Sequence, residues 1–103
     1  MKKLSDANFS EEAGAGLVLI MFSAAWAGPC NLVRPYFEMV ASRFGNQMLF
    51  GEFDLDDNPV TPQKYGVRQL PLFLLLKDGI PKAVKAGAVP EAMLVEICEG
   101  ALA

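Results

Sequence analysis

The hydrophobic positions of this chain gather in three segments that predict β-strands. Residues 17–23, LVLIMFS, are apolar almost throughout and predict a central strand that is buried on both faces. The segments 48–56, MLFGEFDLD, and 71–79, PLFLLLKDG, predict two more strands. The Lys-Asp-Gly that ends the last of these favours a hairpin turn, and the weakly alternating segment 82–88 would be the partner strand.

Between these segments, apolar residues recur at helical spacing. Residues 6–12 predict a short helix with Ser5 or Asp6 as its N-cap. A long amphipathic helix is predicted from about 29 to 44, and its Pro35 removes one backbone hydrogen bond and should bend the axis. The apolar stripe expected along it consists of Leu32, Val33, Phe37, Val40, Ala41 and Phe44.

Two more helices complete the pattern. A short helix is predicted to follow the DDNP segment at 56–59 and to reach Tyr65, and Pro90 is suited to the first position of a last helix. The apolar face of that last helix would consist of Met93, Leu94, Ile97, Cys98 and Leu102.

The order of these elements predicts the fold class. Helix, strand, helix, strand, short helix, hairpin and helix require a parallel crossover first and an antiparallel pair last. We therefore expect an α/β fold with a mixed central sheet of four to five strands flanked by helices on both faces. No linker or repeat divides the chain, so residues 1–103 should form a single domain.

Composition removes several classes of function. The net charge is −3 and the nine cations are spread along the chain, so a nucleic-acid partner is not expected. The longest apolar run, 17–22, is too short to cross a bilayer, and no membrane association is expected. The N-terminus lacks the pattern of a secretion signal, so we expect a cytoplasmic protein.

The reactive side chains are few. There is no histidine, which removes the usual base of nucleophilic catalysis and the commonest transition-metal ligand. Cys30 and Cys98 make neither a disulfide framework nor a zinc set, and no metal or cofactor is predicted. Chemistry would therefore have to come from thiol, carboxylate or ammonium groups.

Five segments, taken together and in order, carry a family resemblance. They are FSAAWAGPC at 22–30, the helical Pro35, DLDDNP at 54–59, YGVRQLP at 65–71, and the KDG turn with Gly87 of KAGA. The chain resembles the thioredoxin family over nearly its whole length. This resemblance implies the thioredoxin fold and a parent activity of protein-disulfide reduction in cell redox homeostasis.

The resemblance also assigns the positions of the active-site turn. WAGPC stands where the family has Trp-Cys-Gly-Pro-Cys, so Ala27 occupies the position of the attacking cysteine and Cys30 that of the resolving cysteine. In the family, the attacking thiolate at a helix N-terminus opens a substrate disulfide, and the second thiol resolves the mixed disulfide. This chain is therefore expected to lack dithiol turnover.

A second departure concerns proton transfer. Family members usually carry a buried Asp near the end of the central strand, often faced by a Lys on the neighbouring strand. The matching residues here are Met21 and Glu52, so that pair is also absent. Gln69 and Leu72 differ from the commoner Gly and Thr.

The resemblance further implies a surface that binds protein. Pro71 matches the family's cis-proline, beside which a substrate peptide lies extended. The residues expected to form this surface are Trp26, Gly28, Pro29, Leu70, Pro71 and Gly87. The implied partners are a protein or peptide substrate and a thioredoxin reductase, and we expect a monomer.

Several alternatives stay open at this point. Cys30 is either an inert buried side chain or a monothiol that senses oxidants. Ala27 is either an engineered substitution in a reductase or the native residue of a redox-inactive binding module. Whether the chain is itself an enzyme depends on the same position.

Overall fold

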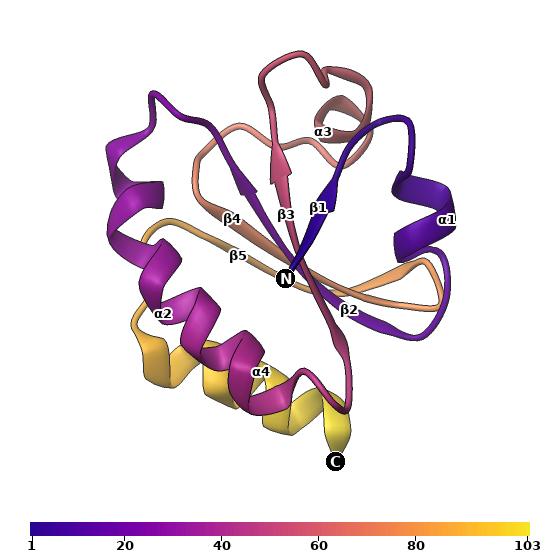
Figure 1. Ribbon diagram of the computed structural model, residues 1–103, viewed down its shortest axis with the longest axis vertical. Helices are drawn as coiled ribbons and strands as arrows, with labels where there is room; N and C mark the ends of the chain where they lie inside the picture. The colour runs from indigo at the N-terminus through magenta and orange to yellow at the C-terminus, as the bar shows by residue number, and fades with distance from the viewer.

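The computed structural model describes all 103 residues. They form one five-stranded sheet and four helices, joined by turns and loops (Figure 1). In chain order the elements are β1 Lys2–Leu4, α1 Phe9–Ala13, β2 Leu17–Ser23, α2 Gly28–Phe44, β3 Leu49–Asp54, α3 Val60–Lys64, β4 Leu72–Lys77, β5 Ile80–Ala86 and α4 Glu91–Leu102. The sequence-based expectation of a mixed sheet flanked by helices is confirmed.

β2 is the central strand of the sheet. The strand order is β1-β3-β2-β4-β5, with β1 and β2 both parallel to β3, and with β4 antiparallel to both β2 and β5. The long helix α2 makes the parallel crossover between β2 and β3, as the order of elements requires. β2 is buried on both faces, which accounts for its uninterrupted apolar sequence.

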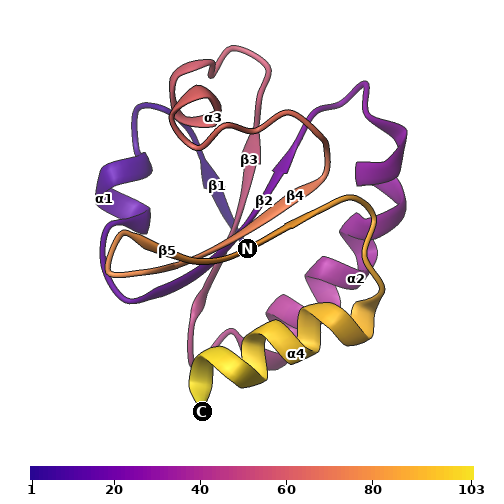
Figure 2. The same ribbon diagram turned by 180° about the vertical axis from the view of Figure 1, so that it is seen from behind.

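Two layers of helices enclose the sheet. α2 and α4 pack side by side on one face, whereas α1 and α3 lie on the other (Figures 1 and 2). The core under α2 and α4 is centred on Leu19, Met21, Val33, Phe37, Val40, Phe73, Leu94 and Cys98. The core on the other face includes Leu4, Phe9, Ala13, Ile20, Phe22, Phe53 and Leu74. No helix is long and apolar enough to cross a membrane.

The N-terminal segment differs from its prediction. Residues 2–4 form β1, which pairs in parallel with β3, and the first helix begins only at Phe9. Asp6 does not cap that helix. Its carboxylate instead accepts hydrogen bonds from the backbone N–H groups of Val60 and Thr61, at 3.0 and 2.8 Å. Asp6 thus supplies acceptors for two N–H groups at the start of α3, a helix that is far from it in the sequence.

The apolar stripe of α2 is narrower than predicted. Val33, Phe37, Val40 and Phe44 are buried as expected, but the Leu32 side chain is 70% exposed. Leu32 points to the solvent side because a residue directly before Val33 lies about 100° away from it around the helix axis. Cys30 takes its place on the buried face, one turn before Val33 and Arg34.

Candidate functional site

The turn between β2 and α2 places WAGPC at one end of the sheet. β2 ends at Ser23 and α2 begins at Gly28, with Ala27 as its N-cap residue in an extended conformation. The Ala27 N–H donates to the carbonyl of Ala24, and the Cys30 N–H donates to the carbonyl of Ala27, both at 3.1 Å. The backbone itself therefore fixes the geometry of this turn, since no side chain caps the helix.

Ala27 and Cys30 lie together in a small buried cluster. Ala24, Ala27 and Cys30 are 0%, 6% and 0% exposed, and the partly buried Leu70 packs against them. Residue 27 thus lies beside the Cys30 thiol, at the N-terminus of a 17-residue helix. The loop that carries Leu70 comes from a part of the chain far away in sequence, and it closes this end of the fold over the thiol.

The same loop leads into Pro71 and Gly87. The Leu70–Pro71 peptide bond is cis, Pro71 is buried, and its carbonyl accepts a hydrogen bond of 2.8 Å from the N–H of Gly87. Gly87 has a φ of +95°, a conformation that favours glycine. The structure therefore brings Leu70 to the thiol cluster and joins Pro71 to Gly87.

Trp26, Gly28 and Pro29 form the exposed part of the turn. The Trp26 side chain is 72% exposed, and its indole N–H donates to a carboxylate oxygen of Asp56 at 3.3 Å. Gly28 and Pro29 are also exposed. Because all three residues are exposed, they make an open surface, and none of them lines the larger cavities of the molecule.

Comparison with known proteins identifies the family. The family model named Thioredoxin matches residues 1–99. The chain belongs to the thioredoxin family. It is 38% identical to a thioredoxin of Rhodospirillum rubrum over 104 residues, which span 99% of this chain and all of that protein. A thioredoxin of Listeria monocytogenes is 37% identical over 94% of each chain, and one of Bacillus subtilis is 37% identical over 92% of this chain and 91% of its own.

Membership of the thioredoxin family is consistent with thiol–disulfide redox chemistry, and the environment of Cys30 bears on that chemistry. Burial raises the pKa of the Cys30 thiol, and the negative charges of Glu52 and Asp54 act in the same direction. A hydrogen bond with the backbone of Ala24 and the positive charge of Arg34 oppose this rise without cancelling it. Cys30 is therefore a protonated thiol at neutral pH.

A network of polar side chains lies beside this thiol. The Arg34 guanidinium from α2 donates to both carboxylate oxygens of Glu52 in β3, at 2.8 to 3.1 Å, and the buried Ser23 hydroxyl donates to Glu52 at 2.7 Å. Burial acts to raise the pKa of Glu52, but the hydrogen bonds from Arg34 and Ser23 outweigh it and hold the pKa below its ordinary value. Glu52 is therefore an ionised carboxylate in a fixed position.

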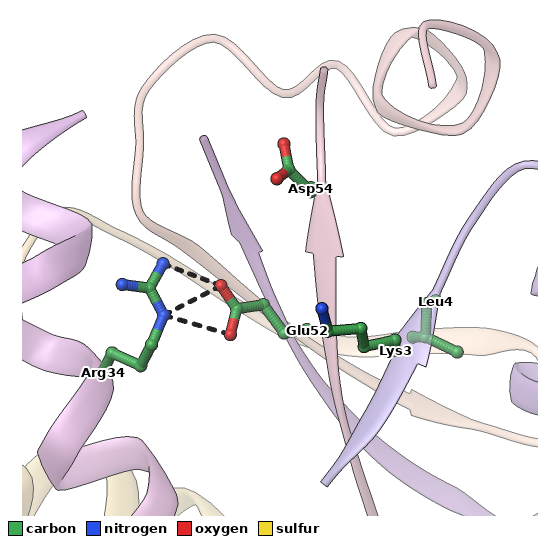
Figure 3. A pocket seen from close by; sticks show the side chains of 5 residues that line it. All are labelled: Lys3, Leu4, Arg34, Glu52 and Asp54. Atoms are coloured by element: carbon green, nitrogen blue, oxygen red, sulfur yellow. Dashed lines mark hydrogen bonds and ion pairs between the residues drawn. The ribbon is translucent and has the colours of Figure 1, made fainter. Parts of the chain in front are cut away.

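The position of this network in the fold is informative. Met21 is the register partner of Glu52 on β2 and is completely buried. In the family resemblance these two positions carry an acid and a lysine, whereas here the apolar Met21 faces the core and Glu52 pairs with α2 instead. A cavity of about 290 Å³ opens beside the pair, lined by Lys3, Leu4, Arg34, Glu52 and Asp54 (Figure 3).

The sequence reasoning missed three residues of this region. Arg34 has a usable signal, because it follows Cys30 by four positions and so lies one helical turn farther along. Ser23 is the one polar residue of β2, and a buried hydroxyl requires a partner. Asp56 offers no signal within the sequence, since its contact with Trp26 joins two separate turns.

The site consists of one buried thiol and an exposed turn beside it. No group of three or more His, Cys, Asp and Glu side chains is arranged to hold a metal ion. Cys98, the second cysteine, is buried in the core under α4 and belongs to a different cluster from Cys30. The two thiols are both free.

Proposed function

We propose that this chain is a thioredoxin-family protein of the thiol–disulfide exchange class in which Ala27 replaces the attacking cysteine, so that dithiol turnover is absent. The observation that carries the proposal is the place of Ala27. It is the N-cap residue of α2, it lies against Cys30 in one buried cluster, and it is the position where the family has its first cysteine. A methyl group there can neither attack a disulfide nor leave from one.

The mechanism expected of the parent site follows from the same geometry. A thiolate at residue 27 would lie at the positive end of α2, which favours its negative charge. Its attack on a substrate disulfide forms a mixed disulfide and releases one substrate thiolate, which takes up a proton. Cys30 then gives up its proton and its thiolate attacks the sulfur at residue 27. The second substrate thiolate leaves and takes up a proton, so that the substrate is reduced and a chain with cysteine at residue 27 is oxidised.

The test is restoration of activity. In an insulin-reduction assay driven by dithiothreitol, the chain should not exceed the rate of dithiothreitol alone, and Ala27→Cys should produce a large gain. Ala27→Ser is the matched control, because it has nearly the same size and no sulfur. A folded Ala27→Cys variant that stays inactive would contradict the proposal of a disabled reductase.

A redox-inactive binding module is the second candidate function. It is favoured by the exposure of Trp26 next to the Pro71 loop and by the absence of a proton acceptor at Met21. A protein or peptide partner would lie extended beside Pro71 and contact the residues Trp26, Gly28, Pro29, Leu70 and Gly87. Replacement of Trp26 by Ala should then weaken capture of a partner with little change in stability, and unchanged capture would exclude this surface.

The complete burial of Cys30 also bears on the monothiol alternative. A monothiol sensor would need Cys30 to meet oxidants, and its complete burial argues against that role. A cytoplasmic monomer that a thioredoxin reductase could recognise through the Trp26 surface fits the proposal best. Native thiol labelling tests the sensor alternative, since rapid modification of Cys30 in the folded chain would favour it.

A further inference from the structure

A series of contacts connects the Cys30 side chain with the Arg34–Glu52 pair. Cys30 packs in a buried cluster with Ala24, whose neighbour Ser23 donates its hydroxyl to Glu52. Glu52 in turn accepts three hydrogen bonds from Arg34, which lies on the same helix as the thiol, four residues after it. These contacts lead from Cys30 in α2 through the end of β2 to Glu52 in β3, and from there back to α2.

The Arg34–Glu52 pair is partly buried and is fixed by further hydrogen bonds. Glu52 and Arg34 have side chains that are only 20% and 28% exposed, and Arg34 is also fixed by donation to the amide oxygen of Asn31 at 2.6 Å. Figure 3 shows the Arg34 side chain extending from its helix to the Glu52 carboxylate. Charges in this partly buried place are screened less by salt than charges on the open surface.

The charges around the thiol have opposite effects. Arg34 stabilises a thiolate at Cys30, whereas Glu52 and, more weakly, Asp54 from β3 destabilise it. Lys3 from β1 stabilises the ionised form of Glu52, and Leu70, which packs against the cluster, carries no charge. Burial has the largest effect on the Cys30 thiol, and the two largest charge effects, which are opposite in sign, come from two residues that are bonded to each other.

We propose that Glu52 offsets the positive charge of Arg34, which α2 places one helical turn after the buried Cys30, and so keeps that charge from favouring a thiolate. Glu52 is thus a positioning and charge-compensating residue that acts through Arg34. The inference deepens the proposed function, since Cys30 is the one thiol left at the active-site turn. It concerns the ionisation of that thiol alone, so it holds or fails whether or not the chain ever reduces a substrate.

The experiment measures ionisation directly. The full chain is labelled with cysteine carrying ¹³C at Cβ, and the Cβ chemical shift of Cys30 is followed with pH, with Cys98→Ser used to assign the two signals. Glu52→Gln keeps an acceptor for Arg34 and removes the charge, and Arg34→Gln removes the opposite charge. The double variant removes both, and amide spectra verify that each variant is folded.

The two single variants should shift the titration of Cys30 in opposite directions. Glu52→Gln should move the Cys30 titration to lower pH, with about threefold more thiolate at a fixed pH, whereas Arg34→Gln should move it to higher pH. The double variant should titrate close to the parent. Arg34→Lys keeps the charge but not the bidentate geometry, so it should also titrate close to the parent.

A purely structural role predicts something different. Loss of the pair would then loosen the end of α2 and admit water to Cys30, so both single variants would shift in the same direction. That result, or an unchanged titration in Glu52→Gln, would overturn the proposal. If Glu52→Gln fails to fold, the comparison of Arg34→Gln with Arg34→Lys still tests the proposal. Equal Cys30 titrations in these two variants would exclude a role for the charge of Arg34.

Discussion

The indole N–H of Trp26 donates a hydrogen bond to a carboxylate oxygen of Asp56 over 3.3 Å. Trp26 precedes α2, and Asp56 lies in the loop that follows β3, so the bond joins two turns at the same end of the sheet. It orients an aromatic ring that is otherwise largely exposed. The most accessible apolar side chain beside the thiol cluster is therefore held in place by a single polar contact.

Removal of this acceptor should release the ring. We expect Asp56→Ala to lower the fluorescence anisotropy of Trp26, the only tryptophan of the chain, and to weaken binding of any partner that uses the ring. Asp56→Asn keeps an acceptor oxygen and is the matched control. Because Asp56 is exposed, the free energy of unfolding should change by less than about 0.5 kcal/mol in either variant. Equal anisotropy in Asp56→Ala and the parent would show that packing alone orients Trp26.

The lowered pKa of Glu52 predicts a loss of stability in acid. A carboxylate whose pKa is lower in the folded chain than in the unfolded chain stabilises the fold above its ordinary pKa, and this contribution is lost as the pH falls through the folded value. Because hydrogen bonds to a charged group are stronger than neutral ones, the parent should be more stable than Glu52→Gln by about 1 to 2 kcal/mol at pH 7. This difference in the free energy of unfolding should shrink as the pH falls below the ordinary carboxyl pKa of 4.5. Urea unfolding of both proteins across this range measures it, and a constant difference would contradict the shift.

The raised pKa of Cys98 predicts a loss of stability at high pH. Burial raises the pKa of its thiol to about 11, above the ordinary value of 9.0. Below pH 9 the thiol is protonated in both states, so its contribution is fully present there and is lost as the pH rises toward 11. The parent should lose roughly 2 kcal/mol more than Cys98→Ala between pH 8 and 11. Parallel unfolding curves for the two proteins would show that Cys98 does not carry this dependence.

Gly51 marks a close contact between β1 and β3. A Cβ atom at this position would lie 2.5 and 2.9 Å from Cδ1 and Cγ of Leu4. Gly51→Ala should therefore displace Leu4, destabilise the fold by about 1 to 3 kcal/mol, and speed amide exchange in β1. Gly100→Ala is the control, because nothing lies within 4 Å of a Cβ there, and an alanine in α4 should be neutral or stabilising. Unfolding free energies of the two variants test the contrast.

The long elements were predictable because each carries its own signal. The uninterrupted apolar run of β2, the spacing of Val33 and Phe37 in α2, and the Lys-Asp-Gly turn before β5 each depend on neighbours in sequence. β1 was missed because three residues with one buried side chain show no alternation. Its existence depends on β3, which offers a free edge, and not on its own pattern.

The site was predictable only where residues are close in the chain. Ala27 and Cys30 could be placed together from the sequence, because three positions in a helix turn bring them onto one side. The Arg34–Glu52 pair could not, since it depends on how α2 lies across β3 and on the register that sets Glu52 beside Met21. Likewise, the sequence predicts Asp6 as the N-cap of the helix that follows it, whereas the fold brings the first backbone N–H groups of α3 to its carboxylate.

Because the two cysteines lie in different parts of the fold, each thiol reports the local opening of its own region. Cys30 is sealed in the cluster at the end of the sheet and Cys98 in the core between α4 and the sheet, so each becomes accessible to a thiol reagent only when its own region opens. Mass spectrometry after a short reagent pulse separates unmodified, singly and doubly modified chains. Peptide mapping of the singly modified chains then shows whether the active-site turn opens before the core, a question that a chain with two adjacent thiols could not answer.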